Sequence, residues 1–202
     1  MALVMITGGA RSGKSRAAQE LAVSRQLDGQ SVTVAVFGSA SDSEMSERIA
    51  RHQADRPADF ALLEGNGSLE WLVSVPEGRL LLVDCLGTCL GRIMLDAWSH
   101  LADSGVEMGD AEDLPAGFEL AVRGAIDLTV SALVDRAGDT LVVTNETGSG
   151  VVPAYATGRL FRDELGRANR LFADRAQASY LAIAGRLLDL GSLPRAISWP
   201  ED

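Results

Sequence analysis

Runs of consecutive apolar residues alternate along the chain with segments whose apolar residues recur at helical spacing. Residues 3–7 form the first apolar run, and residues 14–25 then place apolar side chains at positions 17, 18, 21 and 22. Residues 31–37 form a second, strongly β-branched run. Continuous apolar runs are typical of strands buried on both faces. This order predicts a strand, a crossover helix and a parallel second strand.

The same alternation continues to about residue 184. Further strands are predicted at residues 60–63, 80–84 and 140–144, and further helices at residues 45–54, 85–102, 118–135 and 154–175, before an apolar stretch at 179–184. Residues 104–117 are rich in Asp, Glu, Gly and Pro and indicate an acidic surface loop, and the tail after residue 185 is expected to pack loosely. We therefore predict one α/β domain over residues 1–202, with a mostly parallel sheet between helical layers.

A phosphate-binding motif joins the first strand to the first helix. Gly8-Gly9-Ala10-Arg11-Ser12-Gly13-Lys14-Ser15 fits G-x-x-x-x-G-K-[ST] and is called the P-loop below. Its glycines let backbone N–H groups surround a phosphate, Lys14 can reach the outer oxygens, and the Ser15 hydroxyl can bind Mg²⁺. The motif in this position predicts a P-loop NTPase-like (RecA-like) three-layer fold that binds ligands at the carboxyl ends of its strands.

The strand predicted at residues 80–84 ends in a carboxylate, Asp84. In P-loop enzymes an acid at the end of such a strand commonly holds the Mg²⁺ shell, so Asp84 and Ser15 are the candidate metal ligands. A second interpretation is that Asp84 caps the following helix, which aspartate does well. The two roles are compatible.

Composition narrows the classes of partner. The chain carries 18 Lys and Arg against 28 Asp and Glu, a net charge of −10, which disfavours nucleic acid and anionic membranes as partners. There is no apolar run of about 18 residues and no basic, then apolar, leader, so we expect a cytoplasmic protein without membrane insertion. Cys85 and Cys89 are expected to be reduced thiols in the core.

His52 is one of only two histidines and lies in a basic segment with Arg51 and Arg56. A neutral imidazole can attack phosphorus to form a phosphoramidate, and neighbouring guanidinium groups offset the charge on the transferred group. His52 is therefore a candidate nucleophile. A histidine without a chemical role, on an exposed helix, is the other interpretation, and it is the one we adopt for His100.

Several motifs occur in a fixed order: the P-loop, His52 followed by Arg56-Pro57, residues 81–86, residues 143–153, and R-D-x-x-G-x-x-N at Arg162–Asn169. This series resembles the bifunctional adenosylcobinamide kinase/adenosylcobinamide-phosphate guanylyltransferases of cobalamin biosynthesis, from the first strand to about residue 184. Two positions depart from the family pattern. Phe60 stands where the family usually has Trp, and Gly87 stands where it usually has Thr.

The resemblance implies a two-step enzyme that uses GTP, ATP and Mg²⁺. Adenosylcobinamide is first phosphorylated, and GMP then passes from GTP, through the histidine that matches His52, to adenosylcobinamide phosphate. The resemblance also implies a homotrimer. The nucleotide-binding residues implied are the P-loop, Val36, Phe37, Gly38, Gln53, Ala54, Asp55, Arg56, Glu64 and Asp84. One of the two acids would accept the N–H groups of guanine while the other serves Mg²⁺.

Two other functions fit parts of the sequence. A P-loop kinase of another small alcohol would need no covalent intermediate, and His52 would then have no role. A non-catalytic nucleotide-binding switch would need a partner surface, but no coiled coil or basic strip indicates one.

Overall fold

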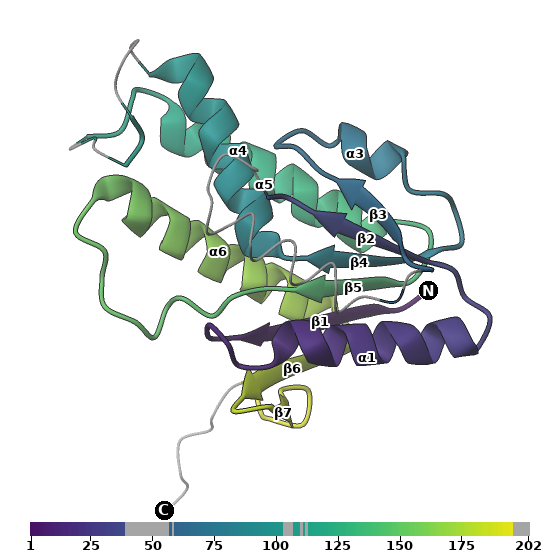
Figure 1. Ribbon diagram of the computed structural model, residues 1–202. Coiled ribbons are helices and arrows are strands. Elements are labelled where there is room, and N and C mark those ends of the chain that lie inside the picture. The colour runs from purple at the N-terminus through teal and green to yellow at the C-terminus, as the bar shows by residue number, and fades with distance from the viewer. Residues whose placement is uncertain (39–56, 58, 103–106, 110, 112, 196–202) are drawn as a thin grey trace, which may run out of the picture.

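The computed structural model describes residues 1–38, 57, 59–102, 107–109, 111 and 113–195. Its centre is a seven-stranded sheet in the order β3-β2-β4-β5-β1-β6-β7 (Figure 1). The strands are β1 (Leu3–Gly8), β2 (Val32–Val36), β3 (Ala61–Glu64), β4 (Leu80–Asp84), β5 (Thr140–Val143), β6 (Ala178–Ile183) and β7 (Arg186–Asp189). All pairs are parallel except β6 with β7. The predicted mostly parallel sheet is confirmed.

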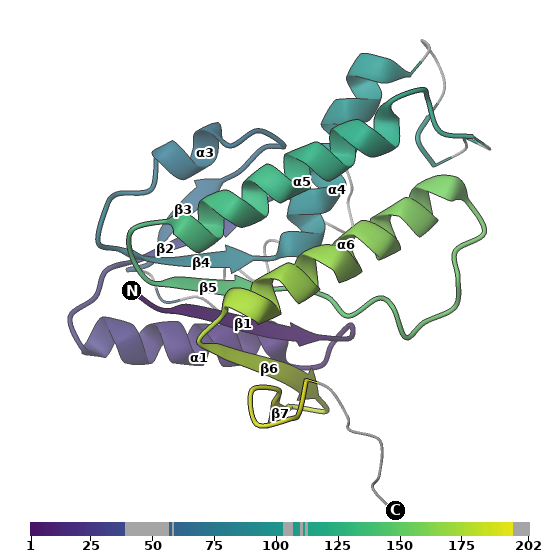
Figure 2. The same cartoon turned by 180° about the vertical axis from the view of Figure 1, so that it is seen from behind.

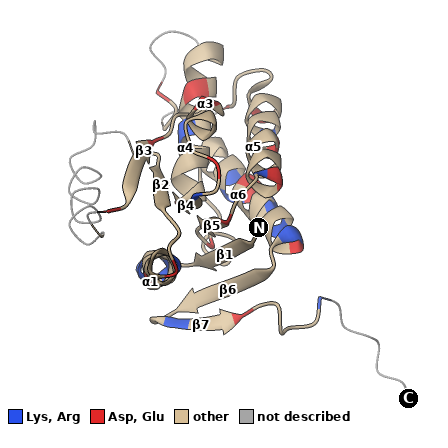
Figure 3. Cartoon of the chain, turned by 90° about the vertical axis from the view of Figure 1, so that its right-hand side faces the viewer, with Lys and Arg blue, Asp and Glu red and all other residues tan. Residues whose placement is uncertain are grey.

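Helices cover both faces of this sheet. They are α1 (Lys14–Leu27), α3 (Glu70–Val73), α4 (Leu86–Leu101), α5 (Phe118–Asp135) and α6 (Ala156–Arg175). Figure 3 shows α1 on one side of the strands and α5 and α6 on the other, which gives three layers. The view from behind in Figure 2 shows α5 and α6 running side by side across the second face.

Side-chain alternation along each strand divides the core between these faces. Ile6 and Val143 point to the α1 side, where they join Ala18 and Ala22. Met5 points the other way, into the larger cluster beneath α4, α5 and α6. Because both faces are covered, the central strands are apolar at nearly every position, which is the pattern seen in the sequence.

Most predicted elements lie where the sequence placed them. The predicted segments 80–84 and 118–135 coincide with β4 and α5, and the other strands and helices in the described residues agree within about two residues. The helix predicted at 45–54 lies outside the described residues. The described part of the 104–117 loop contains no helix or strand. Among the described residues, no helix is both long and apolar enough to cross a membrane.

Two elements were not predicted. The single helical turn α3 was missed, and β7 lies in the segment that was expected to pack loosely after residue 185. β7 pairs antiparallel with β6 through a two-residue turn at Ala184 and Gly185, whose φ angles are 49° and 73°. Such turns, with positive φ at both central residues, match the twist of paired strands. The first part of the tail is therefore an ordered edge strand.

Both cysteines are buried free thiols, as expected from their place in an apolar segment. The pKa of the Cys89 thiol is raised to about 12, mainly by burial and secondly by the electrostatic effect of the neighbouring Cys85. Cys89 is therefore protonated at neutral pH and acts as a core side chain rather than as a nucleophile.

Asp139 ties together the amino edge of the sheet. Its carboxylate accepts hydrogen bonds from the Ala2 amide at 2.8 Å, from Arg25 at 2.8 Å and from Gln30 at 3.1 Å. Burial by itself would raise the pKa of Asp139, but the hydrogen bonds from Arg25, Ala2 and Gln30 outweigh it and lower the pKa. Asp139 thus links the start of β1, the end of α1 and the start of β5.

We expect Asp139→Asn to lower the free energy of unfolding by about 1.5–3 kcal/mol at neutral pH, the usual range for hydrogen bonds to a charged group. Because the pKa of Asp139 is lowered in the folded state, this stabilisation is complete above the unfolded pKa, about 4, and is lost as the pH falls through the folded value. Urea unfolding at pH 7 and in acid measures both effects. Asp28→Asn is the control, since Asp28 faces the same Arg25 from an exposed position at 3.7 Å and should cost under about 1 kcal/mol. Equal losses from the two variants would contradict this role of Asp139.

Candidate nucleotide site at the carboxyl edge of the sheet

The carboxyl ends of the parallel strands bring the sequence-predicted site residues to one edge. The P-loop follows β1, Gly38 lies just after β2, and Glu64 and Asp84 are the last residues of β3 and β4. The strand order places β5 between β4 and β1, so the segment after β5 also reaches this edge. His52 and the predicted nucleotide contacts Gln53, Ala54, Asp55 and Arg56 lie outside the described residues.

Glycines shape the P-loop for close backbone approach. Gly13 precedes α1 with a φ of 97°, a left-handed conformation that favours glycine. A Cβ on Gly8 would lie 2.6 Å from the Ala182 carbonyl oxygen and 2.7 Å from Ser12 Oγ. The turn between β6 and β7 supports the loop, because the Gly185 amide donates a hydrogen bond of 2.9 Å to the Ser12 carbonyl. The hairpin of β6 and β7, which the sequence did not predict, therefore helps to hold the P-loop in place.

Lys14 is turned into the P-loop. Its side chain is almost fully buried, with 6% of the residue exposed, and Nζ donates a hydrogen bond of 3.0 Å to the Gly9 carbonyl oxygen. A positive charge held inside a ring of backbone groups is suited to bind phosphate oxygens.

Ser15 and Asp84 meet across the sheet edge. The Ser15 hydroxyl donates a hydrogen bond of 3.2 Å to Asp84 Oδ1. The N-cap of α4 is Cys85, whose amide is 3.2 Å from Thr88 Oγ1, so the interpretation of Asp84 as the helix cap is wrong by one residue. Within the described part of the chain, no three His, Cys, Asp or Glu side chains cluster as metal ligands. A hydroxyl and one carboxylate suit Mg²⁺, which commonly takes few protein ligands and completes its shell with phosphates and water.

Phe37, just after β2, and Glu64, the last residue of β3, lie at the end of this edge away from β1. Phe37 is buried and its ring packs edge-on against Trp71, with 5.0 Å between ring centroids. The Phe37 side chain is therefore part of the core, and only the main chain around it lies at the edge. Glu64 is exposed at the end of β3. Because β2 lies between β3 and β4, Glu64 and Asp84 are separated by two strand spacings, about 10 Å.

Asn169, in the R-D-x-x-G-x-x-N motif, holds the end of β5. The Thr144 hydroxyl donates to Asn169 Oδ1 at 2.6 Å, and Asn169 Nδ2 donates to the Asn145 carbonyl at 2.9 Å. Asn169 is 8% exposed, so both of its polar groups are satisfied inside the protein. Sequence reasoning gave no role to Thr144, Asn145 or Asn169, although the motif itself was a signal.

The same motif contains a buried carboxylate, Glu164, that joins α6 to α5. Its Oε1 accepts hydrogen bonds of 2.9 and 2.7 Å from Arg123 on α5, and its Oε2 accepts one of 2.8 Å from Arg167. The hydrogen bond that Arg123 donates to Glu164, reinforced by the charge of Glu164, raises the pKa of Arg123. Glu164 and Arg167 occupy variable positions of the motif and join α6 to α5, whereas its Arg162 and Asp163 pair with each other at 3.0 Å.

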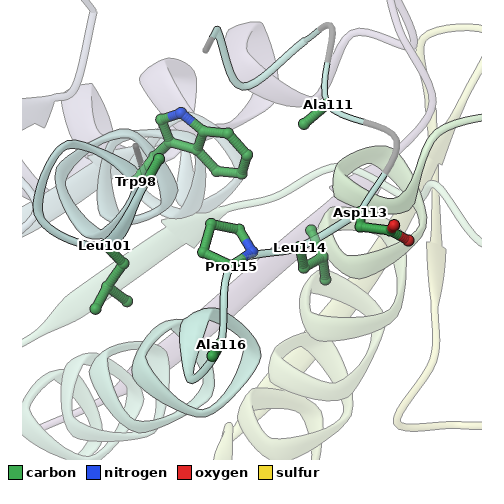
Figure 4. Close-up of a pocket in the computed structure, with 8 residues that line it drawn as sticks. Trp98, Leu101, Ala111, Asp113, Leu114, Pro115 and Ala116 are labelled. Carbon is green, nitrogen blue, oxygen red and sulfur yellow. The ribbon is translucent and has the colours of Figure 1, made fainter. Parts of the chain in front are cut away.

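A cavity lies at the carboxyl end of α4. It has a volume of about 280 Å³ and is formed by α4 and the segment that precedes α5, as Figure 4 shows, with the lining residues Trp98, Leu101, Ala102, Ala111, Asp113, Leu114, Pro115 and Ala116. The described lining contains one carboxylate and no cation, so this cavity is unsuited to phosphate.

Known proteins match this sequence over nearly their whole length. The profile of the family described as "Cobinamide kinase / cobinamide phosphate guanyltransferase" matches residues 4–190. The chain is 34% identical to the "Bifunctional adenosylcobalamin biosynthesis protein CobP" of Pseudomonas aeruginosa, over 94% of this chain and 98% of that protein. It is 30% identical to CobU of Escherichia coli, over 91% and 96% of the two chains, and 31% identical to CobU of Salmonella typhimurium, again over 91% and 96%. The chain therefore belongs to the cobinamide kinase / cobinamide phosphate guanyltransferase family.

Proposed function

We propose that this protein phosphorylates adenosylcobinamide with a nucleoside triphosphate and then transfers GMP from GTP to adenosylcobinamide phosphate. The observation that carries the proposal is the hydrogen bond between Ser15 of the P-loop and Asp84 at the end of β4, which is separated from β1 by β5. The chain in which it occurs belongs to the family named above. The names of the relatives, bifunctional adenosylcobalamin biosynthesis proteins, support both activities.

In the kinase step, the hydroxyl oxygen of adenosylcobinamide forms a bond to the terminal phosphorus of the triphosphate. The bond from that phosphorus to the bridging oxygen breaks, its electron pair stays on the diphosphate, and the hydroxyl proton is released to solvent. The P-loop amides and Lys14 stabilise charge on the phosphate oxygens. Ser15 and Asp84 would hold Mg²⁺, which supplies further charge stabilisation when bound.

In the second step, we propose that His52 is the nucleophile. An imidazole nitrogen bonds to the α-phosphorus of GTP, and pyrophosphate leaves with the electron pair of the broken P–O bond. A phosphate oxygen of adenosylcobinamide phosphate then attacks the same phosphorus, and the P–N bond breaks to restore the histidine. The support is the sequence: a histidine between Arg51 and Arg56, at the family position.

The two acids at the edge are proposed to serve opposite ends of the nucleotide. Asp84 contacts Ser15, so it belongs to the phosphate and metal end. Glu64 lies about 10 Å from Asp84 by strand spacing, away from the phosphate and metal end and toward the side where the base would extend. A carboxylate can accept the N1–H and N2–H groups of guanine together, and adenine lacks that pair of donors. We therefore assign guanine selection to Glu64.

Glu64→Gln should weaken GTP binding more than ATP binding, because an amide offers one acceptor oxygen where the carboxylate offers two. Asp84→Asn should instead lower turnover with both nucleotides and be partly restored by higher Mg²⁺. Nucleotide titrations and Mg²⁺ dependences of turnover measure these effects, and each variant is the control for the other. Small effects that are equal in the two variants and independent of Mg²⁺ would contradict both assignments.

One incubation tests the proposed function as a whole. The protein, Mg²⁺ and GTP labelled at the α-phosphate should give acid-labile, alkali-stable label on the chain, and adenosylcobinamide with GTP labelled at the terminal phosphate should give labelled adenosylcobinamide phosphate. Phosphorylation of a different small alcohol without any label on the chain would show a simple P-loop kinase instead.

A further inference from the structure

Asn145 has a buried side-chain oxygen, Oδ1, with no hydrogen-bond partner among the described residues. Three other buried hydroxyls without partners in that part of the chain belong to the same region: Thr7 precedes the P-loop, Ser12 lies in it, and Thr147 follows β5. Unpartnered buried hydroxyls also occur inside the sheet, at Thr33, Thr140 and Ser179, so the lack of a partner does not by itself mark a site. Buried polar atoms are nearly always paired, and four unpartnered atoms at the edge that holds the P-loop suggest pairing with a ligand there. Thr7 and Ser12 belong to the phosphate site already described, whereas Asn145 requires its own explanation.

The sheet places Asn145 between Asp84 at the end of β4 and the P-loop at the end of β1. Val143, the last residue of β5, pairs with Ile6 on β1 and with Asp84 on β4. The Glu146 amide then donates a hydrogen bond of 3.0 Å to the Gly8 carbonyl, so the chain from 144 to 146 follows the start of the P-loop. Asn145 therefore lies between Asp84 and the P-loop, just beyond the strand ends.

The side chain of Asn145 lies on the α4 side of this edge. Its Nδ2 would be 3.4 Å from a Cβ built on Gly87, in the first turn of α4, and Leu165 of α6 lies 3.6 Å from the same point. The helix that follows the P-loop, α1, covers the opposite face of the sheet (Figure 1). In phosphoryl transfer the attacking oxygen approaches roughly in line with the leaving oxygen, from the side away from the diphosphate. A diphosphate held by the P-loop at the start of α1 would have this side toward α4, where Asn145 lies.

Asn145 is also held rigidly, as a group that orients a substrate must be. Asn169 binds its carbonyl oxygen at 2.9 Å and is itself held by Thr144 at 2.6 Å. The contact from Asn169 pairs the main-chain carbonyl of Asn145, and the side-chain oxygen Oδ1 still lacks a partner among the described residues. An amide oxygen only accepts hydrogen bonds, so the partner of Oδ1 must be an O–H or N–H donor and not a phosphate oxygen. In a kinase reaction, the donor that lies next to the terminal phosphate is the hydroxyl of the second substrate.

We propose that Asn145 Oδ1 accepts a hydrogen bond from the substrate hydroxyl that receives the phosphoryl group, and so orients that hydroxyl toward the terminal phosphorus. The proposal rests on the kinase activity proposed above. The bonds that form and break are those of the kinase step. The amide is not basic enough to take the proton, which still leaves to solvent, so Asn145 aligns the nucleophile without acting as a base.

The test compares Asn145→Leu, which keeps the volume but removes the acceptor, with Asn145→Asp, which keeps an acceptor oxygen. For Asn145→Leu we expect kcat/KM for adenosylcobinamide to fall about 10- to 100-fold, the cost of losing alignment. The Kd of a non-hydrolysable triphosphate and the Mg²⁺ concentration for half-maximal activity should stay as in the wild type. At saturating triphosphate, Asn145→Asp should retain more kcat than Asn145→Leu. Thr144→Val, which removes only the hydroxyl that holds Asn169, should give a smaller loss with the same unchanged Kd.

Three results would overturn the inference while the proposed function stands: full activity of Asn145→Leu, a matching loss of triphosphate affinity, or a raised Mg²⁺ requirement. The last two would assign Oδ1 to the nucleotide or to metal-bound water. A wild-type protein that binds triphosphate but does not phosphorylate adenosylcobinamide would overturn the proposed function, and this inference with it. Unchanged triphosphate binding by the variants also shows that they are folded.

Discussion

Lys14→Ala should lower the turnover of both nucleotide-dependent reactions by about 10²- to 10³-fold, which corresponds to about 2.7–4 kcal/mol of transition-state stabilisation by analogy with a lost oxyanion-hole donor. Lys14 is buried and turned toward the Gly9 carbonyl, so its charge acts inside the loop, where water screens it little. Steady-state rates of adenosylcobinamide phosphorylation and of GMP transfer measure the loss.

Arg16→Ala is the matched control for this experiment. Arg16 lies two residues further along α1, and its exposed side chain pairs with Glu20 at 2.9 Å. Arg16→Ala removes one positive charge, as Lys14→Ala does, but from an exposed position outside the P-loop. Turnover should therefore stay within about twofold of the wild type, as expected for an exposed ion pair. Undiminished turnover of Lys14→Ala, or an equal loss in both variants, would contradict the role of the P-loop lysine.

The sequence was sufficient for the strands that are covered on both faces. Residues 80–84 form such a strand: Leu80 to Val83 are all buried, so each position is apolar, and Asp84 ends the run where the strand reaches the edge. Helix α5 was equally clear, because a glycine precedes it and its buried residues recur at helical spacing. In both cases the local pattern reports burial directly.

The edge strand β7 had no such signal. Its four residues are all exposed, so no alternation distinguishes a strand from a loop. What fixes β7 is pairing with β6, together with the contact between Gly185 and the P-loop. These are interactions between distant residues that a local pattern does not contain.

The candidate site divides in the same way. The P-loop and Asp84 were predicted because the phosphate motif is local and a strand end is visible in the sequence. The contact from Asn169 to Asn145 joins residues 24 positions apart and depends on how α6 crosses the sheet. Hence the sequence indicated the groups expected to bind phosphate, and the fold was needed to find the group that we propose to orient the second substrate.

His52→Asn should abolish the transfer of label from α-phosphate-labelled GTP to the protein. Asparagine is similar in size and can form hydrogen bonds, but it has no basic ring nitrogen to attack phosphorus. Phosphorylation of adenosylcobinamide should persist in the same variant, because that step uses the P-loop, Mg²⁺ and the substrate hydroxyl but no covalent histidine. The measurement is acid-labile label on the chain, beside kinase turnover of the same preparation.

His100→Asn is the control for the loss of labelling, since His100 is exposed in the last turn of α4 and its replacement should leave labelling intact. A protonated imidazole cannot attack phosphorus, so labelling of the wild type should also decline in acid. Label that persists in His52→Asn, or that maps to His100 or to a lysine, would show that the guanylyl group is not carried by His52. Loss of kinase turnover together with labelling would show instead that the two steps share more than the P-loop.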